Sequence, residues 1–208
     1  MISKRSLVRR TAAAAAASAA ALVLAACGSG DGPSGHDDHT ASSPSASASA
    51  AQGRHNAADA AFAKGMIPHH RQAVEMADLA PSRAESAEVK KLAEDIKKAQ
   101  DPEIRTMSGW LTSWGEDVPA EGAMDHSAHG GGGGMMSAEE MDKLKDSSGE
   151  AFDTAFMKMM IEHHEGAVEM AKTEQADGVY GPAKTTAAAI ITSQTAEITQ
   201  MNELLGND

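Results

Sequence analysis

The chain has 208 residues and a mass of 21.5 kDa, which is enough for one medium domain or two small ones. Aromatic residues make up only 3% of it, which argues against β-sandwiches and β-barrels and favours closely packed helices built on alanine and methionine. A formal net charge of −12 argues against nucleic acid as a partner, and the single cysteine excludes an internal disulfide and any Cys-rich metal site.

Residues 1–26 have the pattern of a bacterial export signal. A basic start is followed by an alanine-rich apolar run that is too short to span a bilayer permanently. Residues 24–27, Leu-Ala-Ala-Cys, resemble a lipobox, which implies cleavage before Cys27 and lipid attachment to its sulfur. We therefore expect an exported protein, lipid-anchored to the outer face of the cell membrane. The alternative is plain secretion with a free thiol.

Residues 27–55 carry almost no large apolar side chain, so we interpret them as the lipidated cysteine and a disordered tether. The folded part, 56–208, contains one unit twice. Residues 62–77 align without gaps on 156–171 at an offset of 94, with 11 of 16 positions identical. The same offset relates residues 93–111 to 187–205, so the unit is a duplicated pair of helices.

The hydrophobic spacing predicts four helices, at about 56–80, 82–114, 137–176 and 183–205. The first is expected to stop at Pro81, Pro68 and Pro102 to kink or restart their helices, and the third to break near 147–149. Ser137 and Glu140 predict a capping box. The predicted fold is all-α, a four-helix bundle of two duplicated hairpins joined by a Met/His/Gly-rich loop at 116–136.

One face of each repeated helix carries histidine and methionine together. On a helical wheel these side chains share a sector with Asp59 and Asp153. The first helix contributes Met66, His69, His70 and Met76, and the third contributes Met160, His163, His164 and Met170. Buried imidazoles without partners cost about 1–3 kcal/mol per group, so we predict that the two faces bind a metal ion. Ordinary core packing of methionine and histidine is the alternative.

The ligand types indicate which metal. Imidazole and thioether without thiolate favour Cu(I), with Ag(I) as a soft mimic, whereas zinc rarely takes thioether ligands. Met107 and Met201 occupy equivalent positions on the second and fourth helices and are expected to complete the sites, although simple packing explains them equally well. The loop residues Met124, His126 and His129 suggest capture and transfer of ions; a low-complexity linker is the alternative.

The motifs at 66–76 and 160–170, with those at 100–107 and 194–201, resemble the signature of domain of unknown function family 305. The resemblance covers about 56–205. It implies a ferritin-like helical bundle, export, and an association with copper or silver handling in some members.

Three functions therefore compete. The first is an exported copper-binding lipoprotein that sequesters the ion or passes it to a copper-transfer protein. The second is a ferritin-like oxidoreductase with a dinuclear metal centre, which lacks the expected Glu-x-x-His pairs. The third is a structural module that forms a homodimer without metal. No hydrolytic motif is present, and we do not expect an enzyme.

Overall fold

The computed structural model describes residues 53–121 and 133–207. The regular structure of this part is entirely helical, as predicted. Its helices are α2 (Ala57–Arg83), α3 (Ala87–Trp114), α4 (Ala138–Asp146), α5 (Glu150–Asp177) and α6 (Gly181–Leu205). The predicted signal, Cys27, most of the tether and the loop positions Met124, His126 and His129 lie outside the described residues. None of the described helices is long and apolar enough to cross a membrane.

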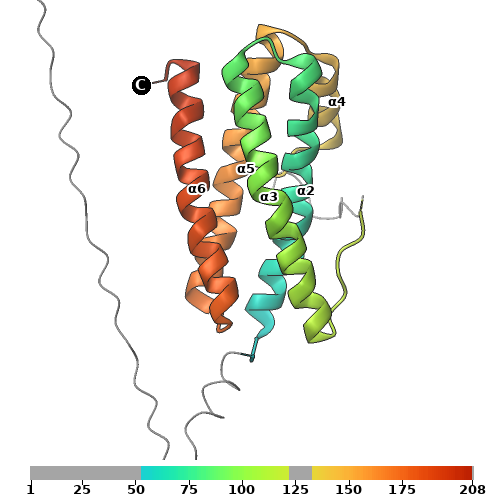
Figure 1. Cartoon of the computed structure of the whole chain (residues 1–208), viewed down its shortest axis with the longest axis vertical. Coiled ribbons are helices and arrows are strands. Elements are labelled where there is room, and N and C mark those ends of the chain that lie inside the picture. Colours follow the sequence, from blue (N-terminus) through green and yellow to red (C-terminus); the bar gives the residue numbers. More distant parts are fainter. Residues whose placement is uncertain (1–52, 122–132, 208) are drawn as a thin grey trace, which may run out of the picture. The chain divides into compact units, whose positions relative to one another are not determined.

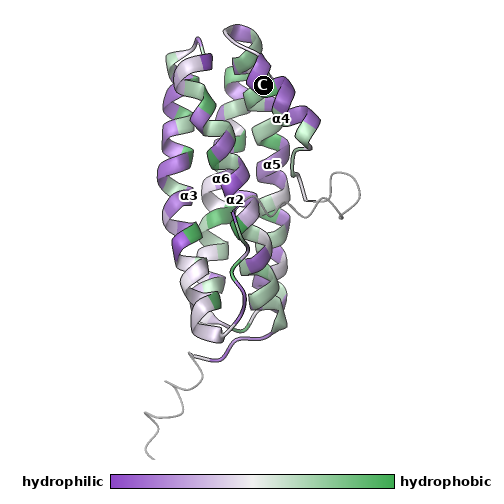
Figure 2. Ribbon diagram, turned by 90° about the vertical axis from the view of Figure 1, so that its right-hand side faces the viewer, coloured by the Kyte–Doolittle hydropathy of each residue, from purple (hydrophilic) through white to green (hydrophobic). Residues whose placement is uncertain are grey.

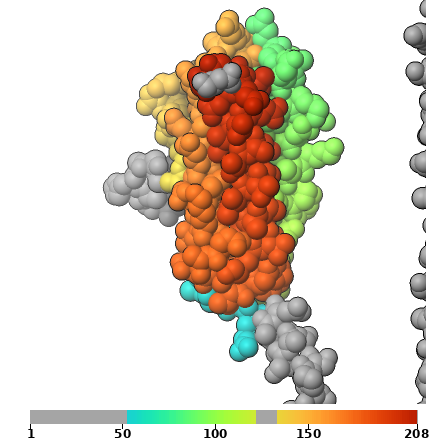
Figure 3. All heavy atoms as spheres, turned by 90° about the vertical axis from the view of Figure 1, so that its left-hand side faces the viewer, coloured from blue at the N-terminus to red at the C-terminus, as the bar shows by residue number. Residues whose placement is uncertain are grey.

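The four long helices form two antiparallel hairpins. In Figure 1, α2 packs against α3 and α5 packs against α6, and the hairpins meet through α2 and α5. Seen from the side in Figure 3, α6 lies along the surface with α5 on one side and α3 on the other. The short helix α4 contacts both α2 and α5. The predicted all-α fold of two duplicated hairpins is confirmed.

Local capping explains where the helices begin. The Ser137 and Glu140 capping box is present at the start of α4, as predicted. The expected break at 147–149 separates α4 from α5, with Gly149 at a φ of 64° that favours glycine. Ser86 caps α3, which therefore begins later than the predicted residue 82.

The predicted end of the first helix at Pro81 was wrong, because α2 continues through Pro81 as far as Arg83. Neither Pro68 in α2 nor Pro102 in α3 interrupts its helix, so neither helix restarts there. A proline removes one backbone donor, but packing of a long apolar face against neighbouring helices can outweigh that loss.

Two apolar clusters fill the bundle, one toward each end. Hydrophilic residues, purple in Figure 2, lie along the outer face of helices such as α3. The upper cluster includes buried residues of α2 from Ala73 onward and of the N-terminal part of α5. The lower cluster includes buried residues of the N-terminal part of α2, and those of α5 from Ala167 onward. The paired histidines at 69–70 and 163–164 fall between these two clusters along their helices.

A buried aspartate at the start of each hairpin binds the turn of the other hairpin. Asp59 accepts hydrogen bonds from two backbone N–H groups of the α5–α6 turn, at 2.9 and 3.1 Å. Asp153 accepts from two N–H groups of the α2–α3 turn, at 2.8 and 3.2 Å. Burial would raise the pKa of Asp59, but these backbone donors lower it below its usual value. Both aspartates therefore bind turns, away from the histidine layer.

Candidate metal centre

The four predicted histidines lie together in the middle of the bundle, where helices α2 and α5 face each other. His69 is 2% exposed and the other three are fully buried. The ring centroids of His69 and His163 are 3.7 Å apart with the planes tilted by 40°. At this distance the tilted rings are in contact, so no ion fits between them. Any ion must instead approach the ring nitrogens at their edges.

Three of the four imidazoles use Nε2 to donate a hydrogen bond. His70 donates to an oxygen of Glu103 at 2.7 Å, and His164 donates to Glu197 at 2.6 Å. These two pairs are related by the repeat, because glutamate follows histidine by 33 residues in both. His69 donates to the backbone carbonyl of Gly133 at 2.8 Å.

The remaining ring nitrogens have no hydrogen-bond partner. They are Nδ1 of all four histidines and Nε2 of His163, five of the eight nitrogens in the layer. From the sequence we expect that protein groups alone do not satisfy every imidazole. Three of the eight ring nitrogens form hydrogen bonds within the protein, and the other five have no hydrogen-bond partner. Each such group costs on the order of 1–3 kcal/mol if nothing binds it.

The environment also keeps two of the imidazoles neutral. Burial lowers the pKa of His69 to about 3. Burial, followed by the neighbouring histidines, lowers the pKa of His163 well below its usual range. A neutral imidazole retains one nitrogen lone pair, which is what a metal ion requires. The layer is therefore suited to binding cations at neutral pH.

The predicted methionines divide into two groups of three on either side of the histidines. We define a lower thioether cluster and an upper thioether cluster by membership of the corresponding apolar cluster. The lower thioether cluster consists of Met66, Met107 and Met170, and the upper one of Met160, Met201 and Met76. Five of these side chains are fully buried, and Met170 is half-buried. Each cluster combines sulfur atoms from three helices, and the repeat offset of 94 relates one cluster to the other.

A short segment, Gly133–Met136, covers the layer on one side. The Gln72 side chain accepts from the Met136 N–H at 2.7 Å and donates to the Met136 carbonyl at 2.8 Å. A Cβ added at Gly166 would lie 1.7 Å from the Gly133 oxygen, so only glycine permits this close approach. The segment therefore packs directly against α5 and brings its carbonyl to His69.

Sequence reasoning missed these partners of the histidines. Glu103 and Glu197 lie in the motifs at 100–107 and 194–201, but the motifs alone do not show that these residues face the histidines. The signal that could have found them is the equal spacing of 33 residues after each histidine pair. One turn earlier, the buried amides of Gln100 and Gln194 also have unpartnered atoms, so both outer helices present polar groups to the core.

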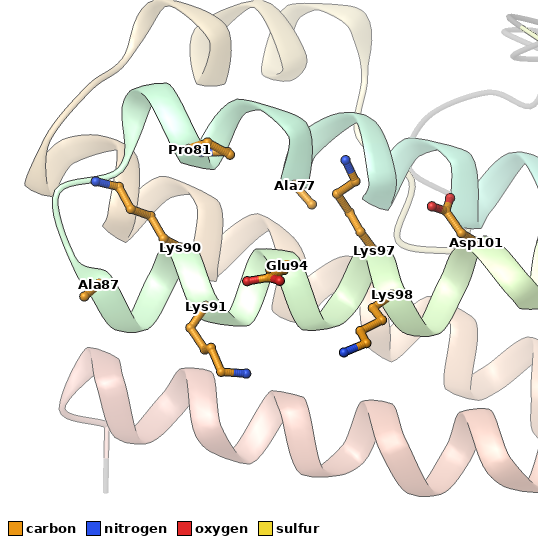
Figure 4. Close-up of a pocket in the computed structure, with 9 residues that line it drawn as sticks. All are labelled: Ala77, Pro81, Ala87, Lys90, Lys91, Glu94, Lys97, Lys98 and Asp101. Atoms are coloured by element: carbon orange, nitrogen blue, oxygen red, sulfur yellow. The ribbon is translucent and has the colours of Figure 1, made fainter.

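Within residues 53–121 and 133–207, no group of three or more His, Cys, Asp or Glu side chains is arranged to hold a metal ion. The donors that lie along these helices are imidazole nitrogens and thioether sulfurs. The four histidines lack the Glu-x-x-His spacing that is typical of a dinuclear carboxylate centre. The surface groove in Figure 4, of about 730 Å³, is lined by Ala77, Pro81 and residues of α3, and none of the predicted ligands lies in it.

The chain matches one protein-family model and several solved structures. The family model "Domain of unknown function (DUF305)" matches residues 59–205. A DUF305 protein from Streptomyces coelicolor, described as secreted, is 36% identical with a TM-score of 0.64, over 72% of this chain and 93% of that one. A DUF305 fragment from Deinococcus radiodurans is 28% identical with a TM-score of 0.65, over 74% and 98%.

The chain is also similar to CopM in its Cu(I)-bound form, with 33% identity and a TM-score of 0.60 over 72% of this chain and 96% of that one. Structures of CopM with Cu(II) and with silver match as well. The comparison with curated proteins gave no match. The family match covers most of the chain and agrees with the helical architecture, so the protein belongs to the DUF305 family.

Proposed function

We propose that this protein is an exported copper-binding protein, with silver as an alternative cargo, that sequesters the ion between its two hairpins. The observation that carries the proposal is the set of five unpartnered imidazole nitrogens, buried between two thioether clusters. Neutral imidazole with thioether and no thiolate is a donor set that favours Cu(I). The similarity to CopM, whose structures contain Cu(I), Cu(II) and silver, supports the same choice of metal.

The proposed ligands fall into two sets related by the repeat. One set combines His69 and His70 with the lower thioether cluster, and the other combines His163 and His164 with the upper thioether cluster. The rings of His69 and His163 are in contact, so the two sets meet at this pair. The two sets also differ. Nε2 of His69 donates a hydrogen bond to the Gly133 carbonyl, whereas Nε2 of His163 has no carbonyl in the corresponding place.

The location of the protein is part of the proposal. The export pattern at 1–26 and the lipobox at Cys27 support a lipoprotein on the outer face of the cell membrane, and the secreted relative is in accord with export. The Met/His-rich loop at 116–136 is proposed to pass the ion to a copper-transfer protein.

The test is a Cu(I) titration of the full chain carrying Cys27→Ser, in competition with a chelator of known affinity. We expect a Kd well below micromolar. Changing the lower thioether cluster together, as Met66→Leu, Met107→Leu and Met170→Leu, preserves core volume and removes sulfur. We expect this triple variant to weaken binding at least tenfold.

The matched control is Met141→Leu, a buried methionine of α4 outside both thioether clusters. It should bind Cu(I) as the parent chain does. Binding at micromolar Kd or weaker, unchanged when all four histidines are replaced by alanine, would contradict the proposed function.

A further inference from the structure

The structure also indicates which histidine nitrogen is available to an ion. In both repeats a glutamate of the outer helix faces Nε2 of a buried histidine, Glu103 with His70 and Glu197 with His164. A carboxylate has no hydrogen to donate, so Nε2 must carry the hydrogen of this bond. The lone pair of the neutral ring is then on Nδ1. In both rings Nδ1 is buried and has no partner.

The same arrangement extends to His69 through a different group. Its Nε2 donates to the Gly133 carbonyl, and a carbonyl, like a carboxylate, can only accept. Three of the four imidazoles therefore present Nδ1 as the only free lone pair. His163 faces neither a glutamate nor the Gly133 carbonyl, so its tautomer is not fixed in this way.

The glutamates are well placed for this role. Their side chains are 23% and 18% exposed, so each carboxylate can remain hydrated on one side while it contacts a fully buried ring on the other. Each glutamate also precedes the methionine of its own helix, Met107 or Met201, by four residues and shares a helix face with it. The outer helices thus provide a carboxylate to orient the imidazole and a thioether beside it.

We propose that Glu103 and Glu197 are positioning residues that fix the Nε2–H tautomer of His70 and His164, so that a soft cation binds through Nδ1. The proposal rests on the proposed function for its cation and on the hydrogen-bond geometry for its tautomer. A carboxylate that orients a metal-binding imidazole also increases the basicity of the ring, and loss of such a partner commonly weakens metal binding by 10–100-fold.

The first part of the test needs no metal. Two-bond ¹H–¹⁵N correlation spectra of the ¹⁵N-labelled full chain report which ring nitrogen carries the hydrogen, with single His→Ala variants for assignment. We expect protonated Nε2 and unprotonated Nδ1 at His70 and His164. Rings that carry the hydrogen on Nδ1 in the parent protein would overturn the proposal, whatever the protein binds.

Variants then separate positioning from general stability. Glu103→Ala should leave His70 as a mixture of tautomers and weaken Ag(I) binding by about 10–100-fold. Glu103→Gln retains an oxygen that accepts the Nε2 hydrogen, so it should preserve the tautomer and restore most of the affinity. Glu94→Ala, at an exposed site on the same helix, is the matched control and should change neither. An unchanged tautomer and affinity in Glu103→Ala would contradict the proposal.

Ag(I) is the second probe, because it is diamagnetic and its binding shifts the resonance of the nitrogen it contacts. We expect the Nδ1 resonances of His70 and His164 to move. If Ag(I) moves Nε2 instead, the proposed function stands and this inference fails. If Ag(I) leaves every histidine nitrogen unchanged, the proposed function fails and the assignment of Nδ1 as a ligand fails with it.

Discussion

The two hairpins can be compared position by position, because one offset relates them. His70 with Glu103 and His164 with Glu197 have nearly equal hydrogen-bond lengths, 2.7 and 2.6 Å. The thioether clusters also correspond. His69 and His163 differ, since only His69 is bonded to the Gly133 carbonyl.

A second difference lies beside the turn-binding aspartates. Asp59 has the buried Glu174 next to it, whereas the residue equivalent to Glu174 near Asp153 is Ala80. The glutamates that are bonded to histidine, Glu103 and Glu197, are thus present in both copies. Among the described residues, Gly133 and Glu174 have no counterpart of this kind in the other hairpin or its turn. Under the proposed function, the groups that both copies share are the ones that serve ion binding.

The largest expected effect is a loss of folding stability in acid, because the rings of His69 and His163 are buried in the neutral form. The unfolded chain protonates these rings near pH 6.5, whereas burial keeps the pKa of folded His69 at about 3 and that of His163 well below its usual range. Stability is therefore fully present above about pH 6.5 and falls as the pH drops below it, by about 1 kcal/mol per pH unit for each ring. Urea unfolding of the metal-free protein from pH 7 to 4 measures this slope.

Replacing His163 with leucine should remove part of the slope. His55→Ala provides the control, since His55 is only half-buried and lies before α2. A metal-free protein whose stability is constant from pH 7 to 4 would show that these rings are not kept neutral by folding.

The next effect concerns the turn-binding aspartates. Asp153→Ala leaves two backbone N–H groups of the α2–α3 turn without their partner, so we expect the free energy of unfolding to fall by about 2–3 kcal/mol. Asp142→Ala, at an exposed site of α4, should change it by less than about 0.5 kcal/mol. Equal results for the two variants in chemical denaturation would rule out the proposed link between the hairpins.

Gly166→Ala tests the Gly133–Met136 segment. The added Cβ would lie 1.7 Å from the Gly133 oxygen, so the segment must move away from α5 and lose its bond to His69. We expect a loss of about 1–3 kcal/mol in stability and faster labelling of His69 by an imidazole-modifying reagent. Gly109→Ala, with no atom near its Cβ, should stabilise α3 by up to about 1 kcal/mol. Unchanged labelling of His69 would show that the segment does not cover it.

The smallest effect is expected at Glu174. Burial, together with Asp59, raises the pKa of Glu174 to about 8. The folded protein therefore holds a proton that the unfolded chain loses near pH 4.5, and stability decreases as the pH rises from 4.5 toward 8. Glu174→Gln should increase the free energy of unfolding at pH 8 by about 1 kcal/mol and flatten this decrease. The exposed Glu169→Gln should do neither, and a destabilised Glu174→Gln at pH 8 would contradict the account.

Much of this architecture could be predicted from sequence, because local signals define it. The helical spacing, the Ser137 cap, the break before Gly149 and the repeat together predicted the hairpins and the inward face of His69. The wheel also placed Asp59 on that face. A helical wheel shows the direction in which a side chain points but not its position along the helix axis. Ten residues of helix separate Asp59 from His69 by about 15 Å, so Asp59 lies outside the histidine layer.

The partners of the histidines could not be predicted in the same way. The pairing of His70 with Glu103 depends on how α2 and α3 are aligned after their turn, which helix spacing alone does not determine. The contact of Gly133 with His69 depends on the backbone passing against Gly166, whereas a glycine-rich composition predicts only a loop. Long-range contacts of this kind need the assembled fold.

The central claim is that a soft ion is bound by imidazole nitrogen and thioether sulfur together. X-ray absorption spectroscopy of the Cu(I)-loaded protein tests it most directly, because sulfur and nitrogen scatterers are distinguishable in the first coordination shell. The account predicts both in the parent protein, and a loss of sulfur scattering when Met66, Met107 and Met170 are changed to leucine. A first shell of nitrogen and oxygen alone in the parent protein would contradict it.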